Sequence, residues 1–290
     1  MVFRFFPICL LISALMLAPG YAQTSLPTPN SGGSRTSDVA LLTPPPQAAT
    51  NTAQPFGLAD NMELVYRLLD DDGKLTGEVR QRVVRLMQQE REEKKKQVVP
   101  ETIALLKSGI YDKRNILEHL QDLTFRARRD TCFTDGMAEV NFDAMRSFRD
   151  RKTAYEPVPL AWPNQPTIGS ELPDGGVTVK VSSSVVSIAS VTTTLRKRRI
   201  IAGPQSLTTP AGTFSCYQVE AEREEATVPR PDMAMRTTLR QVDFYAPGVG
   251  IVRTEIYNKN GKLNRVREMT ARNTTAAGKQ GKAKYKTKKS

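Results

Sequence analysis

The stretch Thr208-Thr209-Pro210-Ala211-Gly212-Thr213-Phe214-Ser215-Cys216-Tyr217-Gln218-Val219 decides how this chain folds. Pro210 has the fixed φ of about −65° that the second residue of a type I turn requires, and Gly212 can adopt a left-handed backbone. A type I turn closed by a left-handed glycine is a common tight hairpin loop. After it, Phe214 and Cys216 point to the same face of a strand. We therefore predict a β-hairpin here.

A second stretch, Phe244-Tyr245-Ala246-Pro247-Gly248-Val249-Gly250-Ile251-Val252, predicts another tight connection. Gly248 directly follows Pro247, which is the requirement of a type II turn. The two stretches together supply a structural turn signature that indicates a strand-rich domain and carries no recognisable chemistry. Its residues are Pro210, Gly212, Pro247, Gly248 and Gly250.

Apolar residues alternate with other positions from Met62 to Leu68, the period of two that marks a half-buried strand. Asp70-Asp71-Asp72-Gly73 then turns the chain, and Leu75 to Leu86 returns it. The same arrangement follows Tyr257, where Asn258-Lys259-Asn260-Gly261 precedes Leu263 to Met269. A weaker echo lies in Ile110-Tyr111-Asp112-Lys113-Arg114-Asn115. Shared hairpin physics and an internal duplication would each produce these echoes.

Other segments complete the strand prediction. Gln88 to Gln97 is charged on all sides and is interpreted as a solvated loop or helical tip, since it has no apolar face. Ile103 to Leu120 fits a strand hairpin better than a helix pair. Pro157 to Pro173 is interpreted as a long crossing loop that packs Trp162 against the sheet. Further strands are expected at 124–130, 137–142, 177–191, 195–201, 214–221, 237–245 and 251–257.

Residues 56–272 are sufficient for one core and form one expected β-rich domain. So many short antiparallel strands are best accommodated by a meander that curls into a half-barrel or sandwich. The predicted fold class is therefore all-β, flanked by a linker at one end and a basic tail at the other.

Residues 1–22 resemble a secretory signal peptide, with Arg4, an apolar stretch and small residues around Tyr21. A membrane anchor is the alternative, but the stretch is shorter than a spanning helix. Cys9 lies inside it and is poorly placed for lipid attachment. Residues 23–55 form a Pro/Ser/Thr-rich linker expected to be disordered, or less readily a partner-binding motif. No later stretch could span a bilayer, so we expect an exported protein that is periplasmic, extracellular or associated with the outer membrane.

The formal charge of the chain is +12, and six of the lysines lie without any acid between Gly278 and Ser290. Half of the excess charge therefore lies in the tail, residues 273–290, which we expect to be disordered. A structured nucleic-acid site would need a basic folded face with interleaved aromatics, so no specific nucleic-acid partner is predicted. The tail either aids solubility or contacts anionic surfaces such as lipid head groups or acidic polysaccharides.

The two turn stretches resemble the signature of the TapB-like family, exported bacterial proteins of unknown function found in Bacteroidota. Leu64 to Gly77 and Cys132-Phe133-Thr134-Asp135-Gly136 match further parts of that pattern. The chain departs from it at Phe244, where tryptophan is usual, and in the charged segment Gln88 to Gln97. The resemblance implies an exported β-rich domain and supplies no catalytic residue.

Residue types that carry chemistry are sparse. His119 is the one histidine, without the pattern of a nucleophilic or metal site. Glu220, Glu222, Glu224 and Glu225 cluster in the sequence. If Glu220, Glu222 and Glu224 share one strand face, they are interpreted as a solvated, charge-paired face, because a paired-carboxylate site would need a cleft. Asp70 to Asp72 lack the calcium-loop pattern. We therefore predict no catalytic, metal-binding or cofactor-binding residue, and no enzyme.

The predicted mature chain has two cysteines, Cys132 and Cys216, in a compartment where disulfides persist. A Cys132–Cys216 disulfide would stabilise the fold by on the order of 4 kcal/mol in the chain-entropy model. Two buried free thiols packing as small apolar groups are the alternative.

Two function classes follow. In the first, the curved sheet binds an apolar or extended ligand, such as a lipid, a peptide strand or a polysaccharide segment. In the second, the domain is a structural or assembly factor for another envelope protein. A large apolar cavity would favour the first class, and a filled core with an exposed apolar edge would favour the second.

Overall fold

The computed structural model describes residues 54–92, 97–148, 151–183, 186–230 and 233–274. The predicted signal peptide lies outside the described residues, as do the predicted linker up to residue 53 and the tail from residue 275. Within the described part, β14 continues to Thr274, past the expected domain boundary at residue 272.

The described chain is built almost entirely of strands, with short helical turns. The strands are β1 Met62–Leu69, β2 Leu75–Glu92, β3 Val98–Asp112, β4 Leu117–Arg128, β5 Thr131–Thr134, β6 Lys152–Val158, β7 Leu160–Pro163, β8 Glu171–Leu172, β9 Gly175–Ser183, β10 Val186–Thr209, β11 Gly212–Arg230, β12 Met233–Ala246, β13 Gly250–Tyr257 and β14 Leu263–Thr274. The helical elements are η1 Pro55–Gly57, η3 Gly136–Glu139, α1 Phe142–Met145 and η4 Arg146–Phe148.

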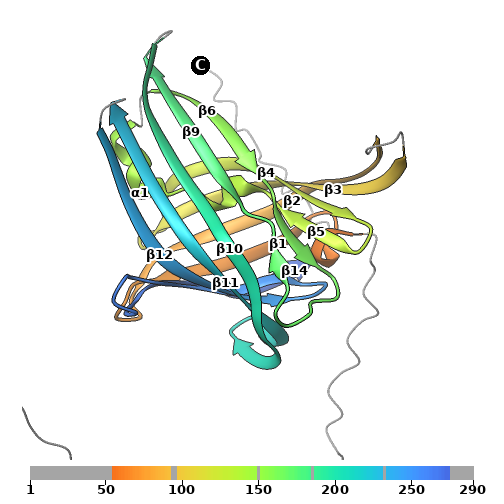
Figure 1. Ribbon diagram of the computed structural model, residues 1–290. Coiled ribbons are helices and arrows are strands. Elements are labelled where there is room, and N and C mark those ends of the chain that lie inside the picture. Colours follow the sequence, from red (N-terminus) through yellow and green to blue (C-terminus); the bar gives the residue numbers. More distant parts are fainter. Residues whose placement is uncertain (1–53, 93–96, 149–150, 184–185, 231–232, 275–290) are drawn as a thin grey trace, which may run out of the picture. The chain divides into compact units, whose positions relative to one another are not determined.

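All strands belong to one 14-stranded sheet, and every neighbouring pair is antiparallel (Figure 1). The order is β6-β9-β10-β11-β12-β13-β14-β1-β2-β3-β4-β5-β7, with β8 paired to β10. β1 pairs with β14, so Met62 lies opposite Thr274. The two ends of the order, β6 and β7, are separated in the chain by Pro159 alone. The sheet thus curls almost into a barrel, which confirms the predicted fold class.

Both predicted tight turns are present. Thr209 pairs with Gly212 across Pro210 and Ala211, in the hairpin of β10 and β11. In the second turn, the Val249 amide donates to the Ala246 carbonyl oxygen at 3.0 Å, and Gly248 has a φ of 74° as a type II turn requires.

The three echoing turns share one hydrogen-bond pattern at one end of the barrel. In each, the Oδ1 atom of the first residue accepts two amides, from the residues two and four positions later, which is an Asx turn. Asn115, with a φ of 63°, occupies the left-handed position that glycine takes in the other two turns. The bonds are Asp72 and Lys74 to Asp70 (3.0 and 2.8 Å), Arg114 and Ile116 to Asp112 (2.9 and 2.8 Å), and Asn260 and Lys262 to Asn258 (2.9 and 3.1 Å).

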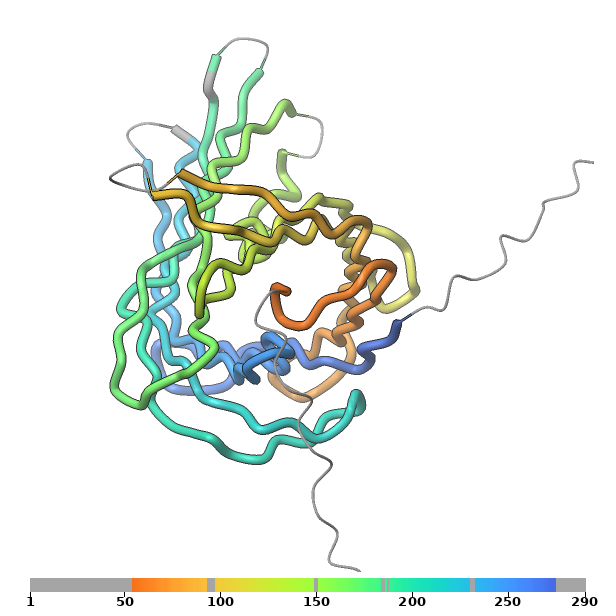
Figure 2. The backbone as a smooth tube through the Cα atoms, turned by 90° about the vertical axis from the view of Figure 1, so that its right-hand side faces the viewer, coloured from red at the N-terminus to blue at the C-terminus, as the bar shows by residue number. Residues whose placement is uncertain are grey.

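The opposite end of the barrel is plugged by η1. Figure 2 shows this N-terminal segment inside the ring of strands. The Phe56 ring meets Phe125 and Tyr245 edge-on, with centroids 5.7 and 6.4 Å apart. Arg272 Nη2 donates to the carbonyl oxygens of Phe56 and Gly57, both at 2.9 Å. The plug is therefore held by aromatic packing and by one arginine of β14.

Trp162 is fully buried, as expected, but the segment around it is not a loop. It belongs to β7, and Lys152–Val158 and Glu171–Leu172 are also strands, so the predicted crossing loop at 157–173 is wrong. Its Nε1 atom donates to Thr134 Oγ1 at 2.9 Å, and the Arg198 guanidinium lies 4.7 Å from its ring centroid. Pairing with β5 supplies the backbone partners that make this segment a strand.

Two other local predictions are also wrong. Gln88–Glu92 belongs to β2, because pairing with β3 satisfies its backbone while its charged side chains stay exposed; residues 93–96 lie outside the described part. The expected strand at 137–142 is helical instead. Asp135 and Asn141 initiate the helical turns, accepting the amides of Met137 (3.0 Å) and Ala144 (3.2 Å).

Of the two alternatives for the cysteines, the structure shows the second, because Cys132 and Cys216 are both free and buried with no bridge between them. Cys132 lies on β5 opposite Trp162, and Cys216 lies on β11 opposite Gln205. β5 and β11 are not neighbours in the sheet. The thiols instead pack as small groups within one large hydrophobic core.

Candidate ligand site in the barrel lumen

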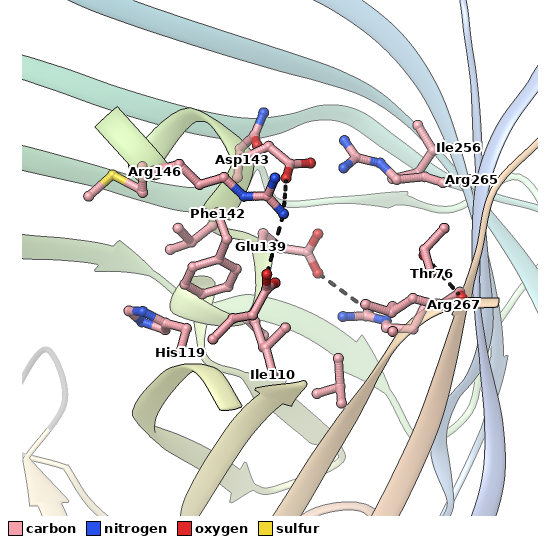
Figure 3. Close-up of a pocket in the computed structure, with 18 of the residues that line it drawn as sticks. Thr76, Ile110, His119, Glu139, Phe142, Asp143, Arg146, Ile256, Arg265 and Arg267 are labelled. Carbon is pink, nitrogen blue, oxygen red and sulfur yellow. Dashed lines mark hydrogen bonds and ion pairs between the residues drawn. The ribbon is translucent and has the colours of Figure 1, made fainter. Parts of the chain in front are cut away.

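A cavity of about 720 Å³ lies inside the barrel at the end of the three echoing turns. Its walls come from the ends of β1 to β4, from β6, β11, β13 and β14, and from the helical segment 136–148. Its volume is within the range typical of small-molecule sites. The cavity is the candidate site of this protein (Figure 3).

The helical segment 136–148, called the insert below, forms one wall. β4 pairs with β5 only through residues 126–128, and β6 pairs with β9, so the described chain has no strand pairing between β4 and β6. The insert packs on the inner faces of β9 and β10 through Val140 and the side chains of α1. It also reaches β4, where Phe142 packs on His119 with centroids 4.3 Å apart. The insert thus stands where strand pairing is missing.

The cavity wall combines apolar side chains with a group of ion pairs. Ile110, Ile256 and Phe142 line the cavity from β3, β13 and α1 (Figure 3). Arg146 pairs with Glu118 at 3.6 Å and with Asp143 at 3.3 Å. This arginine therefore meets two carboxylates, and both are paired.

A second charged cluster, of Glu139, Arg223, Glu225, Arg265 and Arg267, lines the cavity from the insert, β11 and β14 and is called the inner cluster below. Arg223 is buried and fully bonded: Nε donates to Glu225 Oε1 at 2.7 Å and Nη1 to Glu139 Oε2 at 2.7 Å. It also donates to the Glu139 carbonyl oxygen and to a buried glutamine side chain. Arg223 therefore ties the insert to β11.

Arg265 and Arg267 lie two residues apart on the lumen face of β14 and have weaker partners. Arg265 Nη2 donates at 2.9 Å to Glu225 Oε1, the oxygen that Arg223 already uses. Arg267 Nη2 lies 3.7 Å from Glu139 Oε1 and donates to Thr254 Oγ1 at 3.3 Å. Figure 3 shows both side chains reaching from the strand wall into the cavity.

Burial and neighbouring charge shift the ionisation of these groups. Burial opposes ionisation of Glu139, but the charges of Arg267 and Arg223 hold its pKa below the ordinary value. Behind the cluster, burial and then the charge of Glu139 raise the pKa of Asp243. Burial and the charge of Arg223 lower the pKa of Arg265. The carboxylate of Glu139 is thus stabilised, whereas the cation of Arg265 is incompletely compensated.

The residues singled out in the sequence divide between the cavity and the surface. His119 lines the cavity, where burial lowers its pKa. Asp70 forms the Asx turn, and Asp71 pairs with Lys262 at 2.8 Å. Across the ranges that the structure describes, no group of three or more His, Cys, Asp or Glu is placed to hold a metal ion.

The glutamates of β11 occupy two faces. Glu220, Glu222 and Glu224 lie on the outside and pair with Arg199, Lys197 and Arg196, in line with the expected charge-paired face. Glu225 and Arg223 point into the barrel, an orientation that the sequence interpretation does not identify. The alternation of side chains along a strand predicts it, because both residues share a face with buried Val219 and Ala221.

The fold and the cavity define the class first: a nearly closed antiparallel β-barrel with a partly charged internal cavity. Residues 62–269 match the DUF3108-like family, and the chain belongs to it. No curated protein matches the chain.

Two solved structures share the fold. A predicted lipoprotein from Parabacteroides distasonis is 18% identical with a TM-score of 0.60, and a predicted exported protein with a YmcC-like fold from Bacteroides fragilis is 19% identical with a TM-score of 0.51. Each match covers 74% of this chain and 96% of the other. At these identities the likeness shows the fold alone. None of the helices described here is long and apolar enough to cross a membrane.

Proposed function

We propose that this protein is a non-catalytic binding protein that holds an apolar or extended ligand inside the barrel. The observation that carries the proposal is the cavity of about 720 Å³, which the core side chains leave open. Its lining combines apolar side chains from several elements, among them Ile110, Ile256 and Phe142, with two groups of paired charges. Concave sites of this composition are typical of small-molecule binding. Of the ligand classes expected from the sequence, a lipid fits this lining better than a polysaccharide.

The proposal includes an exported location, periplasmic or associated with the outer membrane. The signal-peptide pattern of residues 1–22 supports it, and so do the two solved structures, one a predicted lipoprotein and the other a predicted exported protein. A TapB-like affiliation within the DUF3108-like family and a contact of the Lys-rich tail with anionic surfaces belong to the same proposal.

Native mass spectrometry of the protein purified from a bacterial periplasm tests the binding role. We expect a co-purifying lipid or other small molecule that dissociates on activation. The variant Ile110→Trp, which adds bulk inside the cavity, should lose this mass. Leu120→Trp is the matched control, because Leu120 lies on the adjacent strand and is exposed. An apo mass for the wild type under every condition would overturn the proposal.

An assembly role is the second candidate, and one observation favours it. Leu75, Ile116, Leu117 and Leu120 are exposed beside the turns at the open end. Exposed apolar groups of this kind mark contact surfaces when they are contiguous. A bound envelope protein in the same spectra, lost on changing Leu117 to Ser but retained by Ile110→Trp, would favour assembly over ligand carriage.

A further inference from the structure

The charges of the inner cluster do not balance. Three guanidinium groups, of Arg223, Arg265 and Arg267, meet the two carboxylates of Glu139 and Glu225. Of the three arginines, Arg223 makes the shortest hydrogen bond to each of these two carboxylates. The remaining two arginines share what is left, so the five side chains of the cluster carry one positive charge in excess.

Neither remaining arginine is satisfied by its protein partners. Arg265 has five N–H donors, but its one hydrogen bond goes to an oxygen shared with Arg223, and its buried Nε has no partner within the described residues. Arg267 has a 3.3 Å bond to a hydroxyl group and a long ion pair with Glu139. Their side chains are 36% and 20% exposed, so their unused donors are accessible from the cavity and favour an additional anion.

Other nearby acids are already engaged. Asp243 lies behind the cluster, where its oxygens accept the Thr254 hydroxyl at 2.6 Å and Gln241 Nε2 at 2.9 Å. The charge of Asp143 also acts on Arg265, but its carboxylate pairs with Arg146 at 3.3 Å. The described residues therefore supply no third carboxylate in contact with Arg265.

The spacing of the two arginines suits a small oxyanion. Residues i and i+2 of a strand project to the same face, roughly 6–7 Å apart. Guanidinium groups bind carboxylate and phosphate oxygens in pairs, through charge-assisted hydrogen bonds. An oxyanion between Arg265 and Arg267 would receive donors from both, and an attached apolar chain would extend towards Ile256, Phe142 and Ile110.

We infer that the ligand of the cavity is an anionic amphiphile whose carboxylate or phosphate group binds between Arg265 and Arg267. The inference rests on the proposed function and names the ligand class. The polar group lies at the β14 wall, and the chain lies along the apolar side chains of the cavity. Carboxylate and phosphate share the required oxyanion chemistry.

Isothermal titration of the folded protein with three probes of equal chain length tests the inference: a long-chain fatty acid, the corresponding alkyl phosphate and the neutral alcohol. Each charge-assisted bond contributes about tenfold or more to affinity. We expect at least one anionic probe to bind about tenfold more tightly than the alcohol. Arg265→Gln and Arg267→Gln should each remove most of that preference while leaving the alcohol affinity within about twofold.

Arg199→Gln is the matched control, because Arg199 lies on the outer face and pairs with Glu220. It should keep the full preference for the anion. Retained alcohol binding shows that a variant still has a folded cavity. The inference is overturned if the alcohol binds as tightly as both anionic probes, or if the two cavity variants keep the preference. If none of the three probes binds, both the inference and the proposed function are overturned. Whichever anionic probe binds more tightly, the fatty acid or the alkyl phosphate, identifies the head group.

Discussion

Arg223 illustrates how a charge is accommodated inside this barrel. Its guanidinium is buried, yet each of its nitrogens has an acceptor among Glu139, Glu225 and Gln241. Burial favours the neutral form, but the charges of Glu139 and Glu225 raise the pKa of Arg223. Such a group tolerates burial only as long as its partners remain. Its dependence on them can be measured by removing one partner.

Glu139→Gln should destabilise the fold by about 3–5 kcal/mol, the typical cost of leaving a buried charge without its partner. Glu220→Gln is the control, because Glu220 pairs with Arg199 and Arg240, which are half exposed, and such a pair contributes about 1 kcal/mol or less. Urea unfolding followed by circular dichroism compares the two. If the two variants lose the same free energy of unfolding, the pairing of Glu139 with Arg223 contributes no more to stability than an exposed ion pair.

Gly57 is held against the second turn of the signature. A Cβ atom at this position would lie 2.6 Å from the Gly248 carbonyl oxygen, and its φ is 60°. Gly57→Ala should cost about 2–5 kcal/mol, because backbone strain adds to the clash. Gly73→Ala isolates the strain, since its φ is 77° but its Cβ would meet nothing within 4 Å; it should cost about 1–2 kcal/mol. Thermal unfolding measures the stability of both variants. A similar loss of stability in Gly57→Ala and Gly73→Ala would contradict a close approach between Gly57 and Gly248.

At the scale of elements, the three Asx turns determine the open end of the barrel. The turn between β3 and β4 begins with Asp112 and the turn between β13 and β14 with Asn258, yet both use Oδ1 in the same way. Asp112→Asn should therefore retain the turn. Asp112→Ala removes both acceptor bonds and should lower the melting temperature by about 2–4 °C. Equal melting temperatures for the two variants would show that the side-chain bonds contribute nothing.

These turns were predictable from sequence because their determinants are local. Asp70, Asp112 and Asn258 each bond to amides within four residues. The insert was not predictable in the same way. Its helices are too short for a periodic pattern, and capping by Asp135 and Asn141 has no sequence context to distinguish it from a turn. Gln88–Glu92 shows the opposite error. Its local composition favours a helix, but pairing with β3 makes it a strand.

At the scale of the whole molecule, one continuous core links strands that are far apart in the sheet. Cys132 on β5 and Cys216 on β11 belong to the same hydrophobic cluster. The lumen depends on this closure, so its cavity could not be inferred from strand patterns. Arg223, Glu225, Arg265 and Arg267 were visible only as polar residues among alternating positions, and their convergence requires β11, β14 and the insert to meet.

Both thiols should report unfolding of this core together. Burial raises the pKa of Cys132, and it raises that of Cys216 to about 12, so the reactive thiolate is scarce in the folded protein. We expect almost no reaction with a thiol reagent in buffer and two equivalents in denaturant without reductant. The labelling midpoint should coincide with that of circular dichroism. Absence of thiols after denaturation would instead indicate a disulfide.

The pairing of β1 with β14 has a consequence for the order of events during synthesis. Met62 is among the first domain residues to leave the ribosome and Thr274 among the last, yet they are opposite each other. Until β14 arrives, β1 exposes an open strand edge, which is a template for association between chains. Such non-local pairing also slows folding to milliseconds or longer. The barrel therefore closes only after the whole of residues 62–274 has been made.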